Sequence, residues 1–297
     1  MDKKMTSVKA DLILLLVAFL WGTTFVTSKF SLEQIPPLTI IAVRFIMAVG
    51  LMLILFRKQA KEITKSDLFG GGIVGTVLFI AFASQLIALK YTDPGKQSFL
   101  AAIYVIFVPF LVWGTSRKRP EGKAFAGAFA CLVGIALLTL KDGLNIGFGD
   151  SLTMFSSLFF AGHIITTERY VKRSTPVKIA IIQFGTVAIL STCAALLFED
   201  IPRVISPSVG IGVLYLGIVC TGVAYFLQTF AQKYTKSTHV AIILSLEAVF
   251  GSLLSVVFMK EIFTPRMILG CVIIFGSILV IELKGAKENR PESIEVN

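Results

Sequence analysis

The chain has 297 residues, of which 55% are hydrophobic and only 15% are charged, and its mean hydropathy is +0.83. A soluble domain of this length needs about a quarter of its residues charged to cover its surface. A disordered chain needs low hydrophobicity, and a nucleic-acid-binding chain needs a basic polar face. The composition excludes these classes and predicts an integral membrane protein, with the lipid bilayer as its surroundings and no nucleic-acid partner.

Apolar stretches long enough to cross a bilayer follow one another along the chain. A hydrocarbon core about 30 Å thick requires roughly 20 apolar residues per helix. Ten stretches approach this length, at residues 12–29, 37–56, 68–89, 97–115, 123–140, 151–170, 177–198, 208–231, 238–259 and 266–283. The segments between them are too short for a soluble domain. We therefore expect an all-α membrane protein with ten transmembrane helices, the first of them an uncleaved span because no small-residue cleavage pattern follows it.

The basic residues are distributed unevenly between the two sides of these spans. If the N-terminus lies inside, 20 of the 28 Lys and Arg residues fall on the inner side, 7 fall on the outer side, and Arg44 lies within a span. This bias agrees with the positive-inside rule and, since the number of spans is even, predicts that both termini are cytoplasmic. The net charge of +10 is interpreted as contact with an anionic inner leaflet. The expected location is a cell membrane, the bacterial inner or plasma membrane, as a multi-pass protein.

The two halves of the sequence resemble each other. At an offset of 143, residues 88–92 (ALKYT) match residues 231–235 (AQKYT), and Gln85 falls on Gln228. The first two spans of each half match at an offset of 139 to 140. A shared pattern that keeps its register over four helices indicates an internal duplication.

The number of spans per half determines how the halves are oriented. Each half contains five spans, and because five is odd the second half must enter the membrane from the opposite side. We therefore predict two inverted five-helix repeats, residues 1–145 and 146–297, the second with a short cytoplasmic tail. In such architectures the substrate site lies near the midplane where the repeats meet, and exchange of their conformations opens the site to alternate sides. This pattern indicates a solute transporter rather than an enzyme.

Several motifs, in their order along the chain, resemble EamA-type carriers of the drug/metabolite transporter superfamily. They are Leu20-Trp21-Gly22, Pro37 with Arg44, Gly149-Asp150-Ser151-Leu152, and Ser245-Leu246-Glu247-Ala248-Val249-Phe250 running on to Lys260-Glu261. The resemblance implies a ten-helix transporter of small metabolites, often an exporter of amino acids or related compounds. It also implies a central cavity lined mainly by spans 1, 3, 4, 6, 8 and 9, with the second span, the fifth and the tenth at the periphery.

Two charged residues lie deep inside predicted spans. Arg44 is in the second span and Glu247 is in the ninth. A charge at mid-membrane costs about 2.5–3.5 kcal/mol on insertion scales, so each requires a partner or water. Glu247 is either a proton acceptor or ligand for a substrate amine, or a structural pin. For Arg44 the structural role is favoured over that of a carboxylate anchor, because the second span is expected at the periphery.

The other candidate binding residues are polar or aromatic and lie on spans expected to face the cavity. Trp21, Thr24 and Phe25 share one face of the first span at helical spacing. Gln85 and Gln228 can each donate and accept, which suits a polar or zwitterionic solute, although bonds between helices are the alternative. The remaining candidates are Tyr104, His163 and Tyr225. His163 is either a proton relay or a partner of a neighbouring helix, and both tyrosine hydroxyls need a partner.

The sequence thus predicts a secondary transporter of small organic metabolites, an exporter or exchanger of amino acids and other metabolites, working by alternating access. Import of a vitamin, nucleoside or other metabolite by the same fold is the alternative, and an intramembrane enzyme is a weaker one. No phosphate-binding loop is present, so uphill transport would draw on ion or solute gradients. No cofactor or metal site is expected. Substrate identity, direction, proton coupling and oligomeric state, a homodimer included, are left open.

Overall fold

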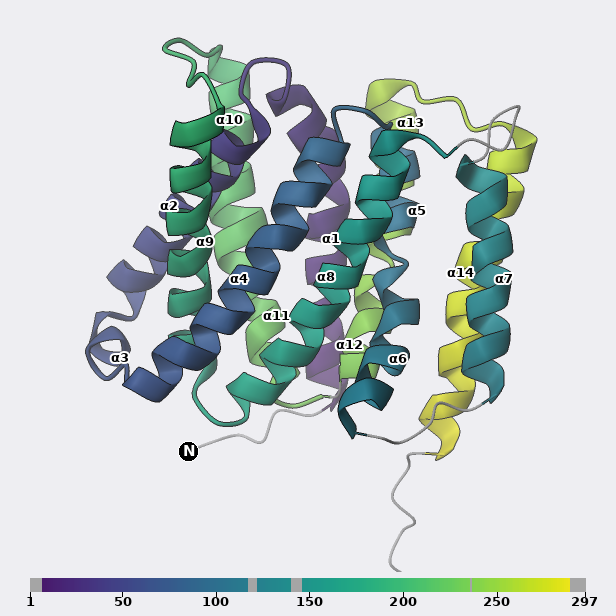
Figure 1. Cartoon of the computed structure of the whole chain (residues 1–297), viewed down its shortest axis with the longest axis horizontal. Helices are drawn as coiled ribbons and strands as arrows, with labels where there is room; N and C mark the ends of the chain where they lie inside the picture. Colours follow the sequence, from purple (N-terminus) through teal and green to yellow (C-terminus); the bar gives the residue numbers. More distant parts are fainter. Residues whose placement is uncertain (1–6, 117–121, 140–145, 236, 289–297) are drawn as a thin grey trace, which may run out of the picture.

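The computed structural model describes residues 7–116, 122–139, 146–235 and 237–288, and all regular elements in these ranges are helices (Figure 1). In chain order they are α1 (Ser7–Ser31), α2 (Pro37–Leu55), α3 (Arg57–Lys61), α4 (Lys65–Ala88), α5 (Pro94–Ala101), α6 (Tyr104–Ser116), α7 (Gly122–Thr139), α8 (Phe148–Val171), α9 (Pro176–Phe198), α10 (Pro207–Tyr215), the π-helix η1 (Leu216–Val223), α11 (Ala224–Gln232), α12 (Ser237–Leu244), α13 (Glu247–Met259) and α14 (Pro265–Glu288).

Helices or runs of consecutive helices occupy the predicted spans. Within the described residues, seven stretches are long and apolar enough to cross a membrane: Lys9–Ser31, Pro37–Leu55, Lys65–Ala88, Pro94–Gly114, Pro176–Phe198, Pro207–Gln232 and His239–Met259. A shorter apolar helix covers Pro265–Ser277. The helix α8 is long enough but rich in Ser and Thr, which lowers its hydropathy. The all-α, multi-pass membrane class is confirmed, while the count of ten spans, their inverted arrangement and the orientation of the termini stay predictions.

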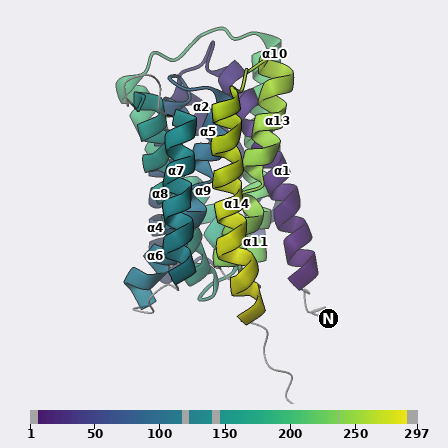
Figure 2. The same ribbon diagram turned by 90° about the vertical axis from the view of Figure 1, so that its right-hand side faces the viewer.

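The helices form one main bundle with a helix pair at its side. In the bundle, α4 packs against α8 and α9, α2 packs against α9 and η1, and α1 packs against α13 and α11. The pair α7 and α14 lie side by side in both views and pack chiefly against each other (Figures 1 and 2). These two helices are the fifth and tenth predicted spans, which the family resemblance placed at the periphery.

The fourth span of each half is broken at the same place. The breaks separate α5 from α6 and α12 from α13, and all four helix boundaries correspond at the 143-residue offset. At both breaks the backbone tightens to i→i−3 hydrogen bonds, from Val105 N to the Ala102 carbonyl and from Ala248 N to the Ser245 carbonyl. The first residue after the break is Tyr104 in the first half and Glu247 in the second.

The eighth predicted span contains a π-helical segment that accommodates α2. In η1 the Thr221 hydroxyl donates to the Leu216 carbonyl five residues earlier, at 2.7 Å. A Cβ added at Gly217 would lie 2.2 Å from Met47 Cε and 3.3 Å from Arg44 Cα, so only a glycine lets α2 approach this closely. Wide turns of this kind often occur at functional sites. Here the turn brings the middle of α2, including Arg44, against the interior of the bundle.

Candidate functional site

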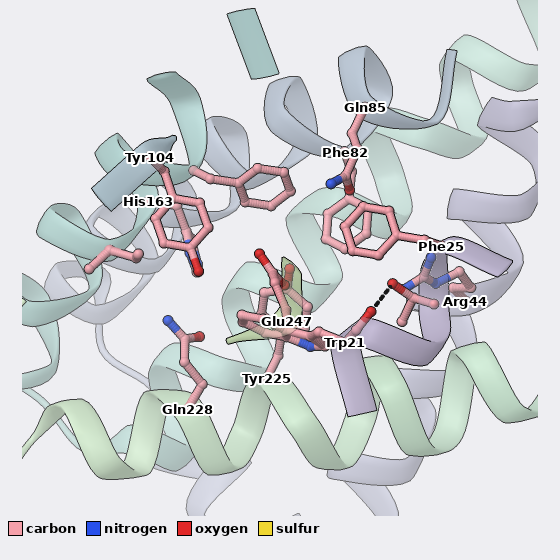
Figure 3. Close-up of a pocket in the computed structure, with 13 residues that line it drawn as sticks. Trp21, Phe25, Arg44, Phe82, Gln85, Tyr104, His163, Tyr225, Gln228 and Glu247 are labelled. Atoms are coloured by element: carbon pink, nitrogen blue, oxygen red, sulfur yellow. Dashed lines mark hydrogen bonds between the residues drawn. The ribbon is translucent and has the colours of Figure 1, made fainter. Parts of the chain in front are cut away.

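A cavity in the middle of the bundle gathers the polar groups of the predicted spans (Figure 3). Its lining comes from α1, α2, α4, α6, α8, α11 and α13, and consists of Trp21, Thr24, Phe25, Arg44, Phe82, Gln85, Tyr104, Phe160, His163, Ile164, Tyr225, Gln228 and Glu247. The free space between these side chains is about 30 Å³. One water needs roughly 10–15 Å³ by this measure, so the cavity has room for about two or three waters. The side chains that line the cavity are therefore closely packed and leave little free space between them.

All nine residues predicted to bind substrate line this one cavity, as does Arg44. Sequence reasoning missed Phe82, Phe160 and Ile164. Phe82 could have been found from the repeat, because it falls on Tyr225 at the 143-residue offset. Phe160 and Ile164 lie beside His163 on one face of α8, so their helical spacing from His163 could have identified them as cavity-lining residues. The structure brings the candidates together, and their roles in binding stay predictions.

Arg44 reaches the cavity from α2, so the expectation that this helix is peripheral was wrong. The reason is the close contact of α2 with η1, which buries the middle of α2 inside the bundle. The Arg44 side chain is 2% exposed, and its Nε donates to the Thr221 hydroxyl at 3.0 Å. Its guanidinium carbon lies 4.9 Å from the centre of the Phe82 ring, a cation–π distance. Among the described residues no carboxylate forms an ion pair with it.

Glu247 begins α13, directly after the break in its span, and is 6% exposed. In the described part of the chain its carboxylate has no salt-bridge partner, so it does not neutralise Arg44. The Tyr104 hydroxyl, at the equivalent position of the first half, faces this carboxylate but completes no hydrogen bond. Figure 3 shows Arg44 on one side of the cavity, Tyr104 and His163 on the other, and Glu247 between them. The cavity therefore holds a guanidinium and a carboxyl group that are not paired with each other.

His163 is held by a neighbouring helix. Its Nε2 lies 3.0 Å from Oε1 of Gln183 on α9, and Gln183 Nε2 donates to the Thr229 hydroxyl at 3.0 Å. The Thr229 hydroxyl in turn donates to the Tyr225 carbonyl. Because the amide of Gln183 is oriented by its bond to Thr229, its oxygen must accept, so His163 carries its proton on Nε2. This is the interhelical bond that the sequence offered as the alternative to a proton relay.

The two glutamines at equivalent positions differ in how they are held. Gln228 Nε2 donates to Gln232 Oε1 at 2.8 Å, while Gln228 Oε1 is buried without a hydrogen-bond partner. Buried polar atoms are nearly always paired, so this orphaned acceptor on the cavity wall is suited to receive a donor from a ligand or water. Gln85 is less buried and uses its backbone carbonyl to accept from Gln97 Nε2 at 2.8 Å.

The aromatic residues form a continuous wall. The Trp21 and Tyr225 rings lie 4.4 Å apart, and the Trp21 indole N–H donates to the Cys220 carbonyl at 3.2 Å. Phe82 packs edge-on against Phe160 at 5.7 Å. The Thr24 hydroxyl donates to the Trp21 carbonyl at 2.7 Å, the dashed line in Figure 3. Rings fixed in this way offer π faces to a cationic or apolar part of a solute.

The arrangement does not favour an intramembrane enzyme. An enzyme would be favoured if Glu247 and His163 met beside a cleft open to lipid. Both line the central cavity, whereas the wider groove beside α1, about 630 Å³, is lined by other residues, among them Phe30, Tyr215 and Phe258. In addition, the His163 Nε2 proton is engaged by Gln183. The cavity places the Arg44 guanidinium and the Glu247 carboxyl group on its walls together with the polar and aromatic side chains.

Comparison with known proteins defines the class to which this fold and cavity belong. The model of the EamA-like transporter family matches residues 8–140 and again residues 147–283. The chain therefore belongs to the EamA-like transporter family, as the sequence motifs indicated.

Individual relatives agree with this class. An uncharacterized transporter of Archaeoglobus fulgidus is 33% identical over 93% of this chain and 86% of its own length. A probable amino-acid metabolite efflux pump of Escherichia coli is 26% identical over 92% of this chain and 94% of its own length. A solved crystal structure matches with a TM-score of 0.70 at 21% identity, covering 95% of this chain and 99% of that one, which shows the fold alone.

Proposed function

We propose that this chain is a secondary transporter of small organic metabolites, with amino acids and related zwitterions as its substrates and export or exchange as its direction. The observation that carries the proposal is that Arg44 and Glu247 line one cavity without pairing with each other. A zwitterion offers a carboxylate to the guanidinium and an ammonium to the carboxylate, and charge-assisted hydrogen bonds of this kind are the strong ones. The naming of one relative as a probable amino-acid metabolite efflux pump supports the same substrate class.

The transport mechanism in this proposal is alternating access between two inverted five-helix repeats, residues 1–145 and 146–297, in the bacterial inner or plasma membrane with both termini cytoplasmic. The size of the cavity supports it. A free space of about 30 Å³ cannot admit an amino acid, so the walls must separate for substrate to enter. Two halves that exchange conformations would open this centre to one side and then to the other.

The proposed driving force is the gradient of the solute itself. In the described part of α1 the acidic side chain is Asp11, and it is engaged by His239 at 2.8 Å near the end of the bundle, away from the cavity. Proton coupling would therefore depend on Glu247. An uncoupled exchanger needs only that the loaded carrier can change state, and such a cycle is reversible, so import runs through the same steps.

Counterflow in proteoliposomes tests this function. Vesicles preloaded with a mixed pool of amino acids and metabolites are assayed for uptake of labelled members of the pool, with and without a pH gradient, for the wild-type protein and Glu247→Gln. We expect exchange in the wild type that ignores the gradient and falls strongly in the variant. Accumulation driven by the pH gradient and lost in Glu247→Gln would replace the uncoupled mechanism by a proton-coupled one. Absence of exchange from every pool would contradict the transporter proposal.

A further inference from the structure

Among the described residues, three acid–base contacts outside the cavity join helices of opposite halves. One of them, Lys178–Asp67 at 3.7 Å, joins α9 to α4, and the other two join the first helix of one half to the broken span of the other half. In one, Lys96 Nζ on α5 lies 2.5 Å from Asp150 Oδ2 on α8. In the other, His239 Nε2 on α12 lies 2.8 Å from Asp11 Oδ1 on α1. None of these four residues lines the cavity.

These two contacts lie at opposite ends of the bundle. Asp11 is close to the beginning of α1. At the other end of α1, Lys29 Nζ donates to the Thr92 carbonyl at 2.9 Å, and the Thr92 hydroxyl donates to Asp150 Oδ1 at 2.9 Å. The Lys96–Asp150 contact therefore belongs to the end where α1 finishes, with the cavity between the two contacts.

The two contacts correspond to each other under the internal repeat. Lys96 falls on His239 at the offset of 143 that relates the fourth spans, and Asp11 falls on Asp150 at the offset of 139 that relates the first spans. Lys96 and His239 are each the third residue of their helix. In both contacts the first helix of one half therefore holds the broken span of the other half.

The two contacts differ in burial. The side chains of Lys96 and Asp150 are 9% and 5% exposed, whereas those of His239 and Asp11 are 37% and 35% exposed. The buried end is further closed by Glu261, whose carboxylate accepts from the backbone N–H of Gly95 at 2.8 Å. A half-exposed contact can exchange its partner for water at little cost, whereas separating a buried pair leaves charges that have lost both partner and solvent.

The helices that carry Lys96 and His239 lead directly to the cavity. Helix α5 ends three residues before Tyr104, and α12 ends three residues before Glu247, with the tightened breaks between. If α5 or α12 pivoted at its break, the contact that it carries would move, while the helix after the break, α6 or α13, stayed wound. The breaks thus connect the cavity walls to the two ends of the bundle.

We propose that Asp11–His239 and Lys96–Asp150 are the opposing gate contacts of the transport cycle, and that the Asp11–His239 end opens more readily than the Lys96–Asp150 end. This inference rests on the proposed transport function, and it assigns roles to four residues outside the binding site. The structure is then the state in which both gates are closed around a contracted cavity. The unequal burial of the contacts makes the two openings unequal in energy, although the backbones of the halves correspond.

Distances between spin labels at the two ends test this assignment at one fixed pH. In a cysteine-free background, exposed positions carry the labels: Lys9 and Lys233 report the Asp11–His239 end, and Lys90 and Ile262 report the other. Pulsed electron paramagnetic resonance on the reconstituted full chain, without added solute, then gives the fraction of molecules with each end open. The control is Glu62→Gln, which removes the carboxylate of an exposed residue outside both contacts.

We expect Asp11→Asn to raise the fraction with long Lys9–Lys233 distances at least threefold, with the Lys90–Ile262 distances unchanged. His239→Lys, which reproduces the lysine of the buried contact, should lower that fraction at least threefold. Unchanged distances in both folded variants would overturn the gate assignment, even if solute exchange is intact. Distances that respond in a protein that exchanges no solute would uphold the gates as contacts that close the ends and would count against the proposed function instead.

Discussion

The broken helix pairs α5–α6 and α12–α13 follow the same course and present different chemistry to the cavity. Their boundaries and the hydrogen bonds at their breaks correspond residue by residue, yet the first residue after the break is a neutral Tyr104 in one half and an acidic Glu247 in the other. Corresponding backbones allow two states of similar energy, as alternating access requires. Unequal side chains allow a solute to be held in one orientation.

The two ends of the bundle also combine corresponding positions with unequal side-chain environments. Lys96–Asp150 is buried and Asp11–His239 is half exposed, although the contacts correspond in sequence. A duplicated backbone can therefore carry two unequal closures. The two halves thus correspond in their helix boundaries and differ in their side chains, and substitutions at matched positions can separate the effects of the two.

The largest expected effect is on stability at the buried end. Lys96→Met leaves the Asp150 carboxylate without its partner, and breaking a buried pair costs about 3–5 kcal/mol. The matched change His239→Met should cost less than about 1 kcal/mol, because that contact is half exposed. Thermal unfolding of the detergent-solubilised variants measures both. The double variant Lys96→Met/Asp150→Leu should recover most of the loss, and equal losses for the two single changes would remove the contrast between the ends.

Next in size is the effect of Glu247→Gln on exchange. Replacing a charged acceptor by a neutral one loses about 1.5–3 kcal/mol of hydrogen-bond energy, which corresponds to a fall of roughly 10- to 100-fold in the exchange rate at low solute concentration. Initial rates of counterflow measure it. An exchange rate within about twofold of wild type would show that the carboxylate has a structural role only.

Gly22 on α1 and Gly162 on α8 are corresponding glycines whose surroundings differ. A Cβ at Gly22 would lie 2.5 Å from Phe250 Cβ on α13, whereas a Cβ at Gly162 would meet only Val77 Cγ1, at 3.4 Å. Overpacking costs about 1–3 kcal/mol, so Gly22→Ala should destabilise by this amount and Gly162→Ala should stay within about 1 kcal/mol of wild type. Thermal unfolding of the two variants side by side tests this. Equal stabilities would mean that α1 and α8 do not differ in how closely they are packed.

The smallest effect is expected at Tyr104. Tyr104→Phe removes a buried hydroxyl that makes no hydrogen bond, so stability should change by less than about 1 kcal/mol. If the hydroxyl binds solute, exchange should fall about fivefold, the equivalent of one neutral hydrogen bond. Counterflow and thermal unfolding on the same preparation separate these readouts. A large loss of stability would show that the hydroxyl supports the fold instead.

Much of this architecture was predictable because it follows from periodicity and burial. The apolar lengths predicted helical segments in the observed places. The repeat placed Gln85 and Gln228 at equivalent positions, and both side chains line the cavity. The polar candidates converged because a polar group in a bilayer must face the interior of the bundle.

The features that the sequence did not predict depend on how closely the helices approach one another. The π-helical turn of η1, with Gly217 against α2, brings Arg44 into the bundle. Neither the hydropathy nor the helical periodicity of residues 216–223 predicts this turn. The breaks before Tyr104 and Glu247 have no Pro or Gly to mark them. Partners such as Gln183 for His163 depend on which helices are adjacent, and a single sequence does not encode that adjacency locally.

In the proposed transport cycle, one cavity is opened alternately to the two sides of the membrane. Thr24→Cys, on the cavity wall, tests it directly in a cysteine-free background reconstituted in one orientation. A membrane-impermeant thiol reagent is supplied from one side or the other, with and without an exchanged solute. We predict modification from either side, at unequal rates, and protection by the solute from both. Modification from one side only under all conditions would contradict alternating access at this site.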